Sequence, residues 1–206
     1  MQFINLFPTT ISGKTLENIT DKEINTFIEY ISKLPYETDM QYGKTSLTQN
    51  LLDYSIFQNL KKEILISSKN YLNEIDHKFT DIQISCSWAN ILKKGQKIQE
   101  HIHSNSYISG VFYLNKGSNI NFFSKLIDFW KFLPDTDYLK RNNFNNKNQR
   151  QWGNYKIPPV PKLLLIFPSW LPHSVQPLEE DINRYSIAFN IIPKGEFGEP
   201  TQKLYL

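Results

Sequence analysis

Three of the four histidines in this chain stand beside apolar, strand-like segments. His101 and His103 are two residues apart, so both imidazoles would project from the same face of a β-strand. His173 lies far downstream, in a segment that Pro168 and Pro172 make stiff. Neutral imidazole is the commonest protein ligand for metal ions near pH 7. The spacing therefore predicts a metal site made by two histidines of one strand and a third from a distant segment.

A cation and a hydroxyl group follow the third histidine. Arg184 and Ser186 are two apart in an alternating segment, so their side chains would share one strand face. A guanidinium can hold a carboxylate through two parallel hydrogen bonds, and a nearby hydroxyl adds another donor. Non-haem Fe(II) sites use two or three protein ligands on one side of the metal, which leaves positions for a co-substrate and O₂. The two patterns together predict such a metal centre beside a carboxylate-binding site.

Two amphipathic segments precede these residues. Apolar residues recur at helical spacing in residues 21–34, which predicts a helix capped by Thr20 or Asp21 and ended by Pro35. Residues 50–75 show the same periodicity and predict one long helix or two abutting ones. We expect both to pack on the outside of a sheet, and we interpret the polar residues 36–46 as a loop.

From residue 79 onward the pattern changes to strands. Alternating or apolar runs predict strands in residues 82–90, 97–103, 107–115, 120–123, 162–167 and 184–192, with a hairpin-type turn at Gly95. A further short strand is predicted at residues 3–7. Helices followed by many short strands are typical of an α+β protein with a barrel or jelly-roll sandwich.

Residues 124–157 interrupt the strand pattern with a polar and aromatic excursion. An irregular segment of that length is uncommon in a compact domain and is usually functional or disordered. Two interpretations stay open. The segment is a lid over a site, with Trp130, Trp152 or Tyr155 at the entrance, or it is a surface insertion with one short helix.

Composition limits the class of protein. A chain of 206 residues with 40% hydrophobic residues is most simply one globular domain, and a net charge of +3 is too small to indicate nucleic-acid binding. No apolar run reaches the roughly 20 residues that a membrane span needs, and the N-terminus lacks the pattern of a signal peptide. The single cysteine, Cys86, excludes an internal disulfide and a thiolate metal cage. We therefore expect a cytoplasmic protein without a membrane segment.

Several stretches in combination resemble the superfamily of 2-oxoglutarate- and Fe(II)-dependent dioxygenases, and in particular a small microbial and phage branch of it. They are LFPT near the start, SWAN, HIHSNSYISGVFYLN, LLLIFPSWLPHSVQP and RYSIAFNI. The resemblance implies a single domain over residues 1–206 with a double-stranded β-helix (jelly-roll) core flanked by N-terminal helices. Its parts would be a strand and scaffold helices (1–78), the core (79–192) with the lid-like insertion 124–157, and a tail (193–206).

The resemblance also assigns residues to the metal. His101 and His173 match the two histidines that hold iron in the family. The family's usual Asp or Glu, two residues after the first histidine, is His103 here. Either the iron has three histidines, or His103 turns away and water takes the third position.

The co-substrate positions follow in the same way. Arg184 would bind the C5 carboxylate of 2-oxoglutarate, and Ser186 would assist it. Asn90 occupies a place like that of an asparagine that contacts 2-oxoglutarate in related alkylation-repair dioxygenases. The further candidates for this pocket are Ser109, Tyr113 and Asn190.

The resemblance implies an oxygenase that hydroxylates its substrate with Fe(II), 2-oxoglutarate and O₂ and releases succinate and CO₂. The superfamily acts on small molecules and on protein side chains, among others, and the sequence does not select between them. Two alternatives stay open. A cupin-like metalloprotein, which is a dioxygenase or isomerase working without 2-oxoglutarate, would suit three histidines but has no need of Arg184. A catalytically inactive binding protein could also use the same fold.

Overall fold

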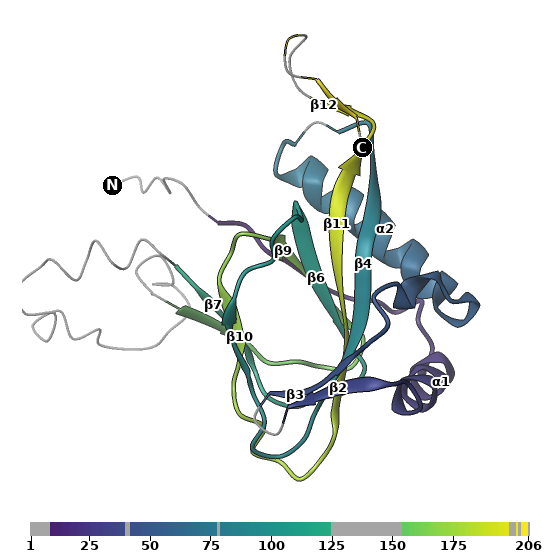
Figure 1. The fold of residues 1–206 in the computed structure, drawn as a ribbon, viewed down its shortest axis with the longest axis vertical. Helices are drawn as coiled ribbons and strands as arrows, with labels where there is room; N and C mark the ends of the chain where they lie inside the picture. The colour runs from purple at the N-terminus through teal and green to yellow at the C-terminus, as the bar shows by residue number, and fades with distance from the viewer. Residues whose placement is uncertain are drawn as a thin grey trace, which may run out of the picture.

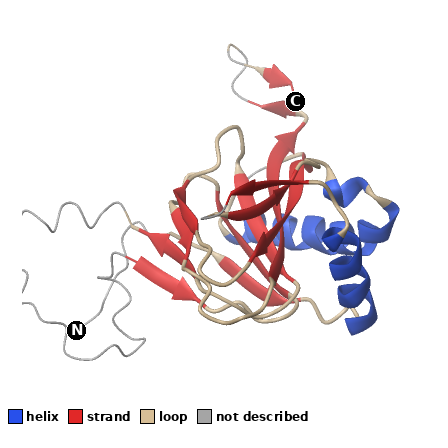
Figure 2. Cartoon of the chain, turned by 60° about the horizontal axis from the view of Figure 1, so that its bottom comes forward, coloured by secondary structure: helices blue, strands red, loops and turns tan. Residues whose placement is uncertain are grey.

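The computed structural model of the protein describes residues 9–39, 42–77, 79–124, 154–197, 201 and 203–205. Within these residues two antiparallel sheets face each other, and two α-helices cover the outer face of the larger sheet (Figures 1 and 2). The strand predicted at residues 3–7 lies outside the described residues. So does most of the predicted insertion, including Trp130 and Trp152.

The first helix forms as its periodicity predicts. Helix α1 (Asp21–Ser32) buries Ile24, Phe27 and Ile31. Its N-cap is a capping box, in which the Thr20 hydroxyl accepts from the Glu23 N–H and the Glu23 carboxylate accepts from the Thr20 N–H. Tertiary contacts and local sequence thus agree at this helix.

The second predicted helix is shorter than its apolar pattern. Helix α2 spans Gln58–Glu74, and two 3₁₀ turns, η1 (Leu51–Asp53) and η2 (Ser55–Phe57), precede it. The physical reason is a contact with the sheet: the buried Leu52 N–H donates to the Ser87 hydroxyl at 2.9 Å. That bond holds the backbone against a strand in place of the first helical turns. Among the described residues, no helix has the length and apolar character needed to cross a bilayer.

The larger sheet has seven strands in the order β1-β9-β6-β11-β4-β3-β2. The strands are β1 (Ser12–Thr15), β2 (Tyr36–Asp39), β3 (Gly43–Ser46), β4 (Asp81–Leu92), β6 (Ile108–Tyr113), β9 (Leu163–Pro168) and β11 (Arg184–Lys194). The loop predicted at residues 36–46 is wrong, because β2 and β3 form a hairpin that extends this sheet. Its residues are polar because the hairpin lies at the edge of the sheet, and so they carry no apolar alternation.

The smaller sheet has four strands in the order β5-β10-β7-β8. They are β5 (Ile98–His101), β7 (Ile120–Phe123), β8 (Asn154–Ile157) and β10 (His173–Val175). Strand β8 is the described end of the predicted insertion, and it pairs with β7. The described part of the C-terminal tail is also partly regular, with β12 (Glu196–Phe197) paired to β13 (Leu204–Tyr205). The α+β class and the jelly-roll core are confirmed by this arrangement.

Candidate metal centre and adjoining pocket

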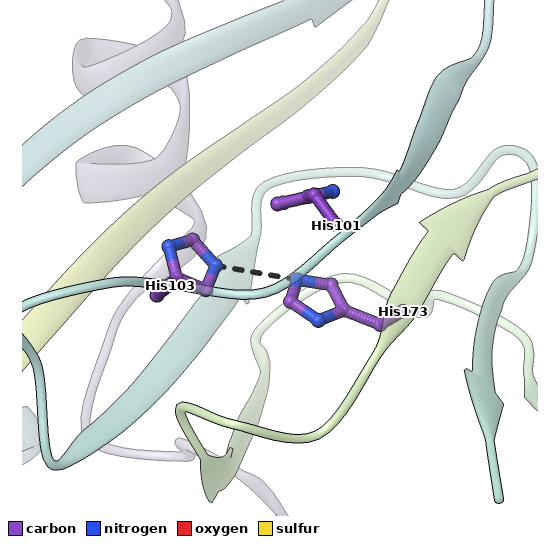
Figure 3. Close-up of side chains that lie close together, drawn as sticks. All are labelled: His101, His103 and His173. Carbon is purple, nitrogen blue, oxygen red and sulfur yellow. Dashed lines mark hydrogen bonds between the residues drawn. The ribbon is translucent and has the colours of Figure 1, made fainter. Parts of the chain in front are cut away.

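Strand ends bring three histidines together. His101 ends β5 and His173 begins β10, and the two residues are direct partners in the antiparallel ladder. His103 follows β5, and its N–H donates to the Ser169 carbonyl at 3.0 Å. One ligand nitrogen from each ring lies within 4.8 Å of the others (Figure 3). The three rings therefore form one cluster that could hold a metal ion.

Backbone carbonyls orient two of the rings. The Nδ1–H of His101 donates to the Gln99 carbonyl at 2.8 Å, and that of His173 donates to the Leu171 carbonyl at 2.9 Å. A carbonyl only accepts, so the proton must be on Nδ1 and the lone pair on Nε2. This is the usual way in which a protein presents an imidazole to a metal.

The third ring is placed at ligand distance from the second. His103 Nε2 lies 3.2 Å from His173 Nε2 (dashed line, Figure 3). Imidazole nitrogens bind a divalent metal at about 2.1 Å, so two ligands at a right angle lie roughly 3 Å apart. The same contact satisfies the geometry of a hydrogen bond, with the proton on His103 Nε2 because His173 Nε2 carries none.

Burial keeps two of the rings neutral. Burial, with a smaller contribution from the neighbouring His101, lowers the pKa of His103 to about 4 and that of His173 to about 3. The hydrogen bond of His173 to the Leu171 carbonyl opposes this shift in part. Both rings are therefore in the metal-binding form at neutral pH.

A buried arginine lies in the same pocket. Arg184 begins β11 and is 1% exposed. Its Nη1 donates to the Ser186 hydroxyl at 3.5 Å, and its Cζ lies 5.0 Å from the centre of the Tyr113 ring. Neither the buried Arg184 Nε nor Tyr113 Oη makes a hydrogen bond of good geometry among the described residues, although the guanidinium and the phenol are close enough to interact. No described carboxylate acts on the pKa of Arg184, which burial lowers.

These observations fit a metal with a dicarboxylate beside it. A buried cation without a counter-charge is strongly unfavourable, so the pocket around Arg184 is suited to an anion. The Nε of Arg184 and the hydroxyl of Tyr113, neither of which makes a hydrogen bond of good geometry, are two donors for such a group. The three imidazoles supply neutral nitrogen ligands, which suit Fe(II).

Gly117 lies close against the aliphatic part of the Arg184 side chain. A Cβ on Gly117 would lie 2.8 Å from Arg184 Cδ and 3.1 Å from its Cβ. Only a residue without a side chain lets the chain pass this close to the arginine. Gly117 therefore helps to direct the guanidinium into the pocket.

The pocket has a volume of about 220 Å³. Its lining includes the three histidines, Arg184 and four other predicted or adjacent polar residues, Asn90, Tyr113, Ser186 and Thr45. The remaining lining residues are Tyr42, Trp88, Ile98, Gly110, Val111, Ile120, Phe167, Val175 and Ala188. The Thr45 hydroxyl donates to Asn90 Oδ1 at 3.1 Å, which leaves the Asn90 amide N–H groups for the pocket.

Two predicted pocket residues lie elsewhere. Ser109 and Asn190 are not among the lining residues. They pair with each other four residues along β6 and β11 from the pair Tyr113 and Ser186, and so lie further from Arg184. The Ser109 hydroxyl donates to Asn190 Oδ1 at 2.7 Å and lies 2.8 Å from the Ser169 hydroxyl. They belong to a buried polar network that holds the loop after β5.

Trp88 and Phe167 also line the pocket, from the strands predicted at residues 82–90 and 162–167. Trp88 lies 5.7 Å from the His103 ring, and Phe167 lies 6.5 Å from the His103 ring and 4.7 Å from the His173 ring, between centres. The missed signal for Trp88 was its spacing of two from Asn90, which places both on one strand face.

A second, larger hollow of about 410 Å³ lies on the helix side of the larger sheet. It is lined by residues of β1, α2 and β9 and contains none of the three histidines. Size alone therefore does not identify the site. The smaller pocket is the candidate because it combines the imidazole cluster with the buried guanidinium.

Comparison with known protein families points to the same kind of site. A family model described as "Putative 2OG-Fe(II) oxygenase" matches residues 86–190, which is half of the chain. No curated protein sequence matches the chain significantly.

Solved structures share the fold at low identity. A non-heme alpha ketoglutarate dependent epimerase, SnoN from nogalamycin biosynthesis, is 10% identical with a TM-score of 0.63, over 92% of this chain and 81% of that one. A prolyl-4-hydroxylase of Pseudomonas putida is 13% identical with a TM-score of 0.59, over 91% and 94%. HygX of Streptomyces hygroscopicus, solved with nickel and 2-oxoglutarate bound, is 13% identical with a TM-score of 0.56, over 90% and 83%. The likeness confirms the double-stranded β-helix fold.

Proposed function

The chain belongs to the 2OG-Fe(II) oxygenase family whose model matches residues 86–190, and from this premise we propose that it hydroxylates a C–H bond of its substrate. When bound, Fe(II) and 2-oxoglutarate supply the oxidising chemistry with O₂, and the co-substrate is released as succinate and CO₂. One observation carries the proposal. The buried guanidinium of Arg184 has no described counter-ion, and it shares a pocket with three convergent histidines.

The metal ligands in this proposal are His101, His103 and His173. The fixed Nδ1–H groups of the first and third, and the 3.2 Å separation of the His103 and His173 nitrogens, support three ligands. In the second arrangement His103 turns away and water replaces it. The facing nitrogens favour the first.

In this proposal the co-substrate would bind at the end of the pocket that contains Arg184, beside the inward-facing side chains of Ser186, Tyr113 and Asn90. Arg184 and Ser186 bind the distal carboxylate, and Tyr113 Oη donates to the same group. The Asn90 amide lies opposite Ser186 in the strand ladder and contacts the co-substrate between this end and the histidines. A cupin-like enzyme that works without 2-oxoglutarate would leave the Arg184 charge buried and uncompensated, which argues against it.

The residues of the pocket support hydroxylation rather than proton abstraction. The described lining has no Asp, Glu, Lys or Cys. Its ionisable hydroxyls are those of Tyr42 and Tyr113, and a phenol is ordinarily protonated at neutral pH. Burial raises the pKa of Tyr113 further, to about 12. No described group besides the histidines is therefore suited to take a proton from a substrate carbon at neutral pH, and insertion of oxygen requires none.

We also propose that the chain acts as one domain, because both sheets contribute to a single pocket. A cytoplasmic location suits it, since Fe(II) needs a reducing compartment and Cys86 is a free thiol.

The test is an anaerobic titration of the protein with Fe(II) and 2-oxoglutarate, in which the weak visible charge-transfer band of the chelate is measured. Wild type should develop the band, and Arg184→Gln should need roughly 10- to 100-fold more 2-oxoglutarate, because a hydrogen bond to a charged group contributes about 1.5–3 kcal/mol. Lys116→Gln, at an exposed lysine, is the matched control. Iron binding without any band would exclude 2-oxoglutarate as the co-substrate.

A further inference from the structure

The wall of the pocket beside the histidines is apolar. Trp88, Ala188 and Val111 are direct neighbours across β4, β11 and β6, so their side chains share the inward face of the larger sheet. Phe167 of β9 also lines the pocket, and its ring centre lies 6.5 Å from that of His103. The ring of His103 thus has two large aromatic side chains near it.

This apolar row is separate from the polar row that faces the co-substrate. Asn90, Ser186 and Tyr113 form the neighbouring inward row, two residues along each strand. Successive inward positions on a strand are roughly 6.6 Å apart. The pocket therefore changes from polar near Arg184 to apolar beside His103.

Permanent charge in the described lining is limited to one group. Arg184 is the only Lys, Arg, Asp or Glu among the described residues that line the pocket. Under the proposed function its charge is used by the distal carboxylate of 2-oxoglutarate. A charged substrate group beside His103 would then be buried without a described partner, which is costly.

We infer that the substrate presents an uncharged, apolar group to the metal, and that Trp88 determines this preference by packing against that group. The inference rests on the proposed function and adds the substrate class. Trp88 is suited to the role because it is partly exposed to the cavity, while Ala188 and Val111 beside it are small enough to leave space over its ring. When an apolar or aromatic substrate group packs on the indole, both the group and the indole lose contact with water, which favours binding.

The experiment uses the full chain loaded with Co(II) and 2-oxoglutarate. Three probes of similar size are compared: benzyl alcohol, benzoate and benzylamine. The measurement is the relaxation of the probe protons in NMR, which paramagnetic Co(II) enhances at short range, with Zn(II)-loaded protein as the diamagnetic reference. Co(II) absorption, recorded before the probes are added, reports whether the metal and 2-oxoglutarate are bound.

Benzyl alcohol should show enhanced relaxation, and both charged probes should bind at least about tenfold more weakly, which corresponds to roughly 1.4 kcal/mol. Trp88→Ala should weaken benzyl alcohol about tenfold, whereas Trp88→Phe should keep its binding within about threefold. Trp170→Ala is the matched control at a tryptophan that is 59% exposed and outside the pocket.

Equal or tighter binding of benzoate or benzylamine would overturn the inference, as would unchanged binding in Trp88→Ala. Absence of relaxation for all three probes, in protein that binds Co(II) and 2-oxoglutarate, would overturn it too. Failure to bind Co(II) or 2-oxoglutarate would instead count against the proposed function, so the two failures are distinguishable.

Discussion

The His103 N–H donates to the Ser169 carbonyl at 3.0 Å, so the segment after β5 is tied to the segment that leads to His173. The Ser169 side chain strengthens this connection. Its hydroxyl donates to the Ser106 hydroxyl at 2.9 Å and lies 2.8 Å from that of Ser109. Ser169 is 1% exposed. A buried hydroxyl network therefore joins the two segments that carry the candidate ligands.

Ser169→Ala should weaken metal binding about tenfold, the lower end of what loss of a residue that supports metal ligands costs. The backbone bond to His103 remains, but the two hydroxyl partners in the network are lost. A Co(II) titration measures the change. Ser55→Ala, at an exposed serine in η2, is the control. Unchanged Co(II) affinity in Ser169→Ala would show that the backbone alone positions His103.

Variants of His103 distinguish the two possible ligand sets. With three histidine ligands, His103→Ala should lower Fe(II) affinity at least about tenfold, while His103→Asp should keep it, because a carboxylate is the family's usual third ligand. If water is the third ligand, His103→Ala should bind iron like wild type. Anaerobic Fe(II) titration is the measurement. His77→Ala, at an exposed histidine bonded to Tyr107, should change nothing.

Gly117→Ala should impair co-substrate binding without affecting the metal. Its new Cβ would lie 2.8 Å from Arg184 Cδ, so the arginine stem must shift away from its present position. We expect about tenfold weaker 2-oxoglutarate binding, since charge-assisted hydrogen bonds depend on geometry. Titration of the Co(II)-loaded protein with 2-oxoglutarate tests this, with Lys116→Ala as the neighbouring control. Equal loss of Co(II) affinity would indicate a general disturbance instead.

The metal-free protein should become less stable as the pH falls below about 6.5. Histidine in the unfolded chain has a pKa near 6.5, whereas burial lowers the pKa of His103 to about 4 and of His173 to about 3 in the folded protein. The unfolded state therefore binds more protons than the folded state between about pH 3 and pH 6.5. The contribution of these two rings to the free energy of unfolding is fully present above pH 6.5 and declines toward pH 3. Urea unfolding in the presence of a chelator, at pH 7 and pH 5, measures this. His103→Gln should show a smaller decline, and an equal one would contradict the assignment to this ring.

Much of the frame was predictable because local and tertiary preferences agree. The capping box at Thr20 and the apolar spacing of α1 specify a helix without reference to the rest of the chain. The alternating segments that became β4, β6 and β11 specify strands for the same reason. Where tertiary contacts compete, the prediction was wrong. Ser87 on β4 holds the backbone at Leu52, so 3₁₀ turns replace the start of the second helix.

Residue types and their spacing were enough to predict the chemistry of the site. The H-x-H spacing, the distant His173 and the Arg184–Ser186 pair indicate a metal centre with a carboxylate site, since residue type and strand period suffice for that. Which side chains share the pocket could not be predicted in the same way. Ser109 and Asn190 lie two inward positions from Ser186, whereas Trp88 lies beside His103. That outcome depends on strand register, which is established by pairing between segments far apart in the chain and not by any segment alone.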